Sequence, residues 1–184
     1  MIARLIFPLL LTVCLPAMAQ ESAVDLSVER VNTAEGQVYQ IEARGEVAAP
    51  PAAVWRVLTD YNRMAEFVPD LRSARVISRS GDQAVVEQYG SAHVLFFRRD
   101  IHLVVQVREQ PMTKIDVSLL DGDMKVYRCS WQLAPVPATG GTRVVYRGTM
   151  APKFYVPGML GAKFIRSDVD RMLRAVLARL DRAD

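Results

Sequence analysis

Few residues of this chain combine a reactive side chain with a position that would bring it into a protein core. Arg99 is the clearest case, because it shares the parity of Phe97 and Ile101 in a stretch that alternates like a β-strand. A guanidinium inside a core requires a carboxylate, a carbonyl or a ligand headgroup, since an unpaired buried charge is costly. Glu87, on the neighbouring predicted strand, is the candidate partner. A one-residue bulge would instead turn Arg99 into solvent.

Metal binding and nucleophilic catalysis have little support in the sequence. His93 and His102 stand nine residues apart on one predicted strand, Ala92 to Arg108, so an unbroken strand would point them to opposite faces. No cysteine or carboxylate cluster stands at ligand spacing around them, and we therefore predict neither a metal nor a cofactor. Cys129 lies mid-strand among apolar neighbours, which predicts a buried, inert thiol. The chain also lacks the G-x-S-x-G and G-x-x-x-x-G-K-[ST] motifs.

Aromatic side chains on the predicted inward parity of the strands indicate a ligand cavity. An apolar cavity with a few convergent polar groups is the usual form of a small-molecule site, and tyrosine and tryptophan bring polar tips that require partners. The predicted cavity residues are Tyr89, Phe97, Arg99, Tyr127, Trp131, Tyr146, Met150, Val169 and Met172. The candidates for orienting a polar group of the ligand are Arg99, Glu87 and His93. The alternative is that the same aromatics fill a solid core.

The elements that must hold these side chains are strands and one long helix. The last helix, Gly158 to Arg182, carries an apolar stripe at helical spacing and charges on the opposite side. Before it, runs with period-two alternation are separated by short turns, which predicts an antiparallel meander. Pro50 and Pro51 open one short helix, and a second runs from Tyr61 to Val68. The predicted fold class is α+β: a curved antiparallel sheet gripping the C-terminal helix, with two short helices after the first long strand.

The N-terminus carries the features of a secretory signal. Arg4 supplies a positive charge, Leu5 to Leu15 an apolar core, and Ala17-Met18-Ala19 a small-x-small cleavage site. The apolar run is shorter than the ~20 residues that a membrane span needs. We therefore predict a signal peptide over residues 1–19, cleaved near Ala19, and one ligand-binding domain over residues 20–184. Such a protein would be exported, either to a periplasm or as a secreted protein.

Charge and cysteine content limit the partners and the sources of stability. The net charge is only +3 and the basic residues are scattered, so no nucleic-acid partner is expected. Removal of the signal peptide would leave Cys129 as the only cysteine, so no intramolecular disulfide could form and stability must come from packing. The sequence leaves the oligomeric state open.

An apolar segment at the start of the last helix is a candidate gate at the entrance to the cavity. The predicted gate residues are Phe154, Tyr155, Met159 and Phe164. Basic residues flank them, namely Lys153, Lys163 and Arg166. The gate could therefore touch a membrane surface transiently, with apolar tips in the interface and cations near anionic headgroups. Alternatively, the short helix around Trp55 covers these residues.

The order of elements and two motifs resemble a known family. The segment from Pro50 to Tyr61 reads P-P-x-x-V-W-x-V-L-T-D-Y, and Phe67 to Pro69 reads F-V-P. With the strands and the long final helix, they resemble the polyketide cyclase/dehydrase branch of the START-like (SRPBCC, helix-grip) superfamily, which includes the coenzyme Q-binding START proteins. The resemblance spans Tyr39 to Leu180. It implies a curved sheet gripping the helix around an apolar cavity that holds lipids, isoprenoids, polyketides or similar molecules.

The resemblance does not imply one activity, because binders, carriers and enzymes share the fold. The favoured interpretation is an exported protein that binds a hydrophobic small molecule (a lipid, an isoprenoid or quinone, or a polyketide-like compound) without chemistry. One rival is a metal-free cyclase or dehydratase that uses Arg99, Glu87, His93 or a tyrosine as acid or base. The other is an interaction module with a filled core.

Overall fold

The computed structural model describes residues 24–94, 97–156 and 158–182, and the predicted signal peptide lies outside these ranges. The described chain forms eight strands, a short α-helix, a 3-10 helix and a long C-terminal α-helix. Their bounds are β1 Asp25–Thr33, β2 Gly36–Val47, α1 Pro51–Leu58, η1 Tyr61–Glu66, β3 Leu71–Ser80, β4 Gln83–Val94, β5 Phe97–Gln110, β6 Lys114–Gly122, β7 Met124–Val136, β8 Gly141–Pro152 and α2 Gly158–Leu180.

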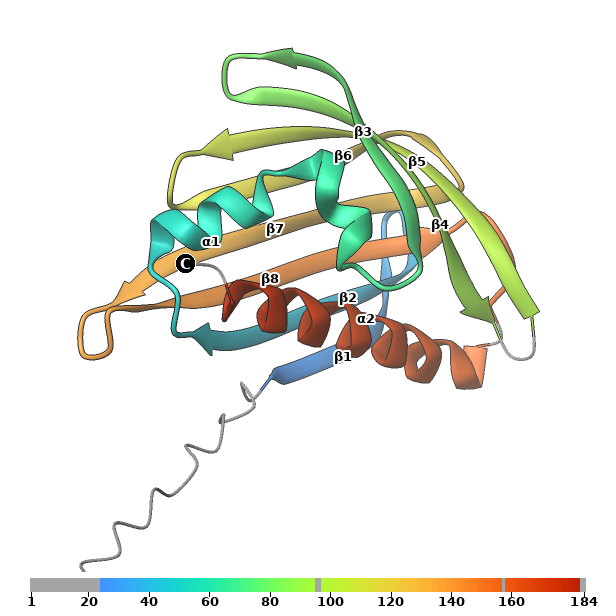
Figure 1. Ribbon diagram of the computed structural model, residues 1–184. Coiled ribbons are helices and arrows are strands. Elements are labelled where there is room, and N and C mark those ends of the chain that lie inside the picture. The colour runs from blue at the N-terminus through green and yellow to red at the C-terminus, as the bar shows by residue number, and fades with distance from the viewer. Residues whose placement is uncertain (1–23, 95–96, 157, 183–184) are drawn as a thin grey trace, which may run out of the picture.

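The eight described strands form one antiparallel sheet in the order β1-β2-β8-β7-β6-β5-β4-β3. Strands β3 to β8 follow one another as neighbours, and β8 returns to pair with β2. The sheet curves around α2, while α1 and η1 lie over the same concave side (Figure 1). The predicted α+β architecture, with two short helices after the first long strands, is confirmed.

Helix α2 is held from two sides of the curved sheet. It packs against β1 and β2 on one side and β4 on the other, and α1 adds further contacts. Its apolar stripe is buried, since Val169, Leu173, Val176, Leu177 and Leu180 are each at most 6% exposed. Burying each such side chain stabilises the fold by about 1.5–3 kcal/mol, so the stripe explains why the sheet closes on this helix.

One predicted strand is wrong. The stretch from Ala92 to Arg108 is two strands, because β4 ends at Val94 and β5 begins at Phe97, with these two residues paired. His93 and His102 therefore lie on adjacent strands rather than on one. The sequence between the strands is Leu95-Phe96, and no Gly, Pro, Asn or Asp stands there to mark a turn.

A close backbone approach fixes the loop between η1 and β3 against β4. The carbonyl oxygen of Asp70 accepts a hydrogen bond of 2.9 Å from the backbone N–H of Ser91. A Cβ atom on residue 90 would lie 2.7 Å from that oxygen, so only Gly90 permits the approach. Asp70 itself has a φ of 63°, which is uncommon for a residue with a side chain. The loop therefore presents the Asp70 carboxylate at a fixed place beside β4.

Candidate functional site

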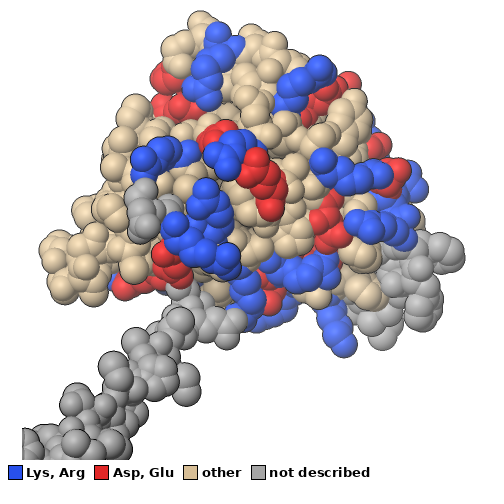
Figure 2. All heavy atoms as spheres, in the orientation of Figure 1, with Lys and Arg blue, Asp and Glu red and all other residues tan. Residues whose placement is uncertain are grey.

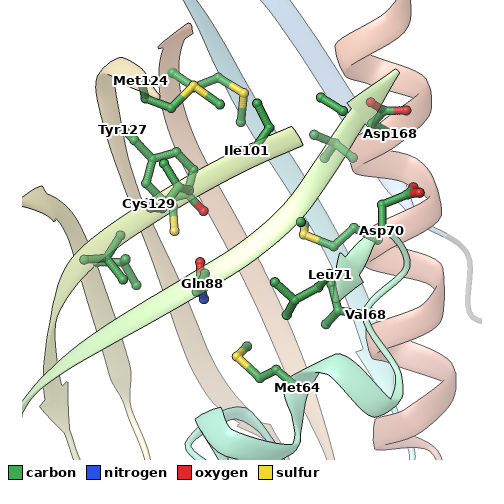
Figure 3. Close-up of a pocket in the computed structure, with 18 of the residues that line it drawn as sticks. Met64, Val68, Asp70, Leu71, Gln88, Ile101, Met124, Tyr127, Cys129 and Asp168 are labelled. Carbon is green, nitrogen blue, oxygen red and sulfur yellow. The ribbon is translucent and has the colours of Figure 1, made fainter. Parts of the chain in front are cut away.

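A cavity of about 290 Å³ lies between the concave face of the sheet and α2. Its wall draws on η1, the loop before β3, the inner faces of β4 to β8 and helix α2 (Figure 3). The volume is close to the lower end of the ~300–1,000 Å³ that is typical of small-molecule sites. The core is therefore hollow at this point rather than solid.

Most of the cavity wall is apolar, because alternate residues of each strand face inward. On β5 the inward residues are Ile101, Leu103, Val105 and Val107, all at most 9% exposed. Methionine side chains from η1, β7, β8 and α2 complete the wall, and their flexible thioethers suit a surface that must adapt to a ligand. These methionines are Met64, Met124, Met150 and Met172.

Charged side chains gather at one rim of the cavity, where α2 meets the loop before β3 and strand β4. Arg171 donates hydrogen bonds of 2.8 Å to both Asp70 and Asp168. The Nη2 atom of Arg171 also lies 3.4 Å from the His93 Nδ1 atom, and Arg98 donates to Asp70 at 3.1 Å. His93 lines the cavity while its side chain is 42% exposed, so the cavity reaches solvent here. The Asp70–Arg171 bond ties α2 to the loop across this rim.

Neutral polar groups form a second patch inside the cavity, on β4, β7 and β8. The side chains of Gln88, Tyr127, Cys129 and Tyr146 all line it. The hydroxyls of Tyr127 and Tyr146 both lie beside the Cys129 thiol and act to lower its pKa. Gly148 leaves room for this arrangement, because a Cβ atom there would lie 2.9 Å from the Tyr146 hydroxyl oxygen. Figure 3 shows Tyr127 and Cys129 across the pocket from Asp70 and Asp168.

Burial keeps these groups protonated. It raises the pKa of the Cys129 thiol to about 12. The pKa of Tyr127 is raised well above its usual value by the charge that Cys129 would carry and by burial, and the pKa of Tyr146 chiefly by burial. At neutral pH the patch therefore consists of hydrogen-bond donors and acceptors without a charge. Among the described residues, no group of His, Cys, Asp and Glu side chains is arranged to hold a metal ion.

A hydrogen-bond network around the buried Glu109 carboxylate anchors η1. The Tyr61 hydroxyl donates a 2.8 Å hydrogen bond to Glu109, and Arg79 donates two more to the same carboxylate at 3.0 and 3.3 Å. Burial and the bond to Glu109 raise the pKa of Tyr61 above its usual value. Glu109 continues the inward parity of Val105 and Val107 on β5, so its inward position could have been predicted from the sequence, whereas its partners Tyr61 and Arg79 could not.

The structure brings many of the predicted site residues together. Those on the cavity wall are Tyr127, Trp131, Tyr146, Met150, Val169 and Met172, with the predicted gate residues Phe154 and Phe164. Trp131 and Tyr146 pack ring against ring, with centroids 4.8 Å apart. His93 also lines the cavity, although it lies at the charged rim rather than among the aromatics.

Tyr89 and Glu87 lie away from the predicted position. Tyr89 is 43% exposed, stacks on His102 at 4.5 Å and donates a hydrogen bond to Glu87, which also pairs with Arg75. Neither residue lines the cavity, because the inward residues of β4 are Ala84, Val86, Gln88 and Gly90. The adjacent Val85 and Val86 make the parity of this strand ambiguous, and a shift of one residue exchanges the faces.

Arg99 keeps the parity of Ile101 but is exposed, because it pairs with Ala92 near the end of the β4–β5 hairpin. Its guanidinium lies 4.8 Å from the centroid of the Phe154 ring, a cation–π contact, and it has no contact with Glu87. Tyr155, another predicted gate residue, is 82% exposed. The side chains of Phe97 and Met159 lie outside the described part of the structure.

Comparison with known proteins assigns the family. The family model described as polyketide cyclase / dehydrase and lipid transport matches residues 47–177. The chain belongs to this family. Residues 47–177 include α1, η1, most of the sheet and nearly all of α2, so the match spans the whole cavity. No curated protein matches the chain significantly.

Solved structures show the same fold at low sequence identity. A STAR-related lipid transfer protein from Xanthomonas axonopodis is 17% identical, with a TM-score of 0.67 over 88% of this chain and 99% of that one. The ZhuI aromatase/cyclase from Streptomyces sp. R1128 is 17% identical, with a TM-score of 0.66 over 79% and 94%. A START superfamily protein from Mycobacterium smegmatis is 15% identical, with a TM-score of 0.65 over 79% and 99%. These likenesses confirm the START-like, helix-grip fold.

Proposed function

We propose that this protein binds a hydrophobic small molecule, of the lipid, isoprenoid or polyketide-like kind, in the cavity between the sheet and α2. The observation that carries the proposal is the cavity itself, whose wall is mostly apolar. Each methylene group that a ligand buries there contributes about 0.8 kcal/mol. The family's association with lipid transport and the likeness to a lipid transfer protein support the same interpretation.

Binding without a reaction is favoured over a cyclase or dehydratase activity. An efficient general acid or base has a pKa near the working pH. The pKa values of the titratable groups in the inner patch lie far above neutral pH. The pKa of Cys129 is raised to about 12, and those of Tyr127 and Tyr146 lie well above their usual values. Such groups orient a ligand through hydrogen bonds but release a proton poorly.

We also propose export and a transient contact with a membrane surface. The signal-like N-terminus supports export to a periplasm or the exterior. Exposed Tyr155 follows Phe154 of the cavity wall, and Lys153 and Lys163 lie near them in the sequence. Figure 2 shows basic side chains spread over the face that carries α2, with acidic ones among them. This combination suits an anionic bilayer from which an apolar ligand could enter. Among the described residues, no helix is long and apolar enough to cross a bilayer.

The test is binding of N-phenyl-1-naphthylamine, a neutral apolar dye that fluoresces when it leaves water. Met172→Trp would fill the cavity and is expected to weaken dye binding at least tenfold. Ile77→Trp, at a residue that is 49% exposed on β3 and not on the cavity wall, is the matched control and should bind like the parent protein. Native mass spectrometry of the purified protein should also detect a bound apolar molecule. Dye binding that Met172→Trp leaves unchanged would overturn the proposal.

A further inference from the structure

The neutral patch gives the cavity more hydrogen-bonding groups than binding of a purely apolar ligand requires. Gln88, Tyr127, Cys129 and Tyr146 bring an amide, two phenols and a thiol to one cavity from three strands. We propose that this patch is a subsite for a neutral oxygen function of the ligand, such as a ketone or quinone carbonyl. The inference rests on the proposed function and names the ligand class: a hydrophobic molecule that carries an uncharged carbonyl group.

The hydrogen-bonding capacity of the patch is only partly used. Among the described residues, the Gln88 carboxamide has no hydrogen-bond partner, and it faces the cavity (Figure 3). The two tyrosine hydroxyls lie beside the Cys129 thiol, and sulfur is a weak acceptor. A carbonyl oxygen is a stronger acceptor than the thiol. A hydroxyl that turns from sulfur to a ligand oxygen therefore gains a better bond at little cost.

The charge distribution excludes an anionic end group from this subsite. The carboxylates and histidine on the cavity wall are Asp70, Asp168 and His93, and all three belong to the rim. The Glu109 carboxylate is held by Tyr61 and Arg79 and is not on the cavity wall. A carboxylate or phosphate beside Tyr127 would lie in an apolar surrounding without a cation, which is costly. A carbonyl carries no such penalty.

The subsite should discriminate between two dyes of similar size. Prodan, a naphthalene with a ketone, has a carbonyl for the patch, whereas N-phenyl-1-naphthylamine has none. The double variant Tyr127→Phe plus Tyr146→Phe removes two hydroxyls and keeps both rings. We expect it to weaken Prodan binding about tenfold and to change binding of the other dye less than twofold. Tyr89→Phe removes a hydroxyl on the outer face and is the matched control.

A second measurement does not depend on how the double variant folds. The infrared carbonyl stretch of Prodan bound to the parent protein should lie below its value in hexane, because a hydrogen bond weakens the C=O bond. A stretch at the hexane value would overturn the inference, and so would equal losses for the two dyes in the double variant. If neither dye binds the parent protein, the proposed function fails as well. If the apolar dye binds without this discrimination, only the carbonyl subsite fails.

Discussion

Replacing Arg171 with alanine is expected to speed the release of a bound ligand about fivefold. Arg171 makes two ion pairs of 2.8 Å, but the one with Asp168 lies within α2 and does not hold the rim closed. The pair with Asp70 joins α2 to the loop before β3. Its side chains are 44% and 20% exposed, so solvent screening limits the pair to about 1 kcal/mol. A loss of that size raises the open fraction of the rim about fivefold.

The assay is stopped-flow dissociation of N-phenyl-1-naphthylamine from the loaded protein into an excess of empty phospholipid vesicles. Arg143→Ala is the matched control, since Arg143 makes an exposed ion pair with Glu46 on the outer side of the sheet and does not line the cavity. Raising the salt concentration should speed release from the parent protein more than from Arg171→Ala, because screening weakens only a pair that is present. A release rate that Arg171→Ala does not change, in a folded protein, would refute the role of the rim.

Two further predictions concern Glu109 and Cys129. Glu109→Ala should lower the free energy of unfolding by about 2–3 kcal/mol in urea titrations, because the Tyr61 hydroxyl and Arg79 lose their partner. The Arg79 side chain is 42% exposed, so the loss should stay below that of a fully buried pair. Glu109→Gln keeps an acceptor oxygen and should lose less, so equal losses would contradict this account. Cys129 should react with iodoacetamide at pH 8 at least about a hundredfold more slowly in the folded protein than in urea, because its pKa of about 12 leaves little thiolate. Rates within a few-fold of each other would show that the thiol is not held protonated.

The large elements were predictable because each carries a long periodic pattern. Period-two alternation gives the strands, and the stripe through Val169 and Val176 gives α2. The break between β4 and β5 was not predicted because it falls in an apolar run without Gly, Pro, Asn or Asp, which reads as a continuing strand. The helix end, predicted at Arg182 and found at Leu180, differs by two residues, as helix ends commonly do.

The inner patch was partly predictable and the rim was not. On β7, Trp131 and Leu133 fix the parity, and Tyr127 and Cys129 follow from it. On β4, Gln88 and Gly90 occupy inward positions where alternation predicts apolar residues, so the faces were exchanged. At the rim, Asp70, His93 and Arg171 come together from three separate segments of the chain. No local sequence pattern predicts contacts between such distant residues.

The separation of charged and neutral polar groups along the cavity determines how an amphiphilic ligand would lie. Because an ion inside an apolar wall is costly, the uncharged end of the ligand belongs beside Tyr127 and Tyr146, and any charged end belongs at the rim beside Arg171. Glu109 adds no unpaired charge to the cavity wall, because its carboxylate pairs with Arg79 and accepts a hydrogen bond from Tyr61. On the proposed function, release would depend on opening the Asp70–Arg171 bond and selectivity on the patch, so mutations at the two places should change different measurable quantities.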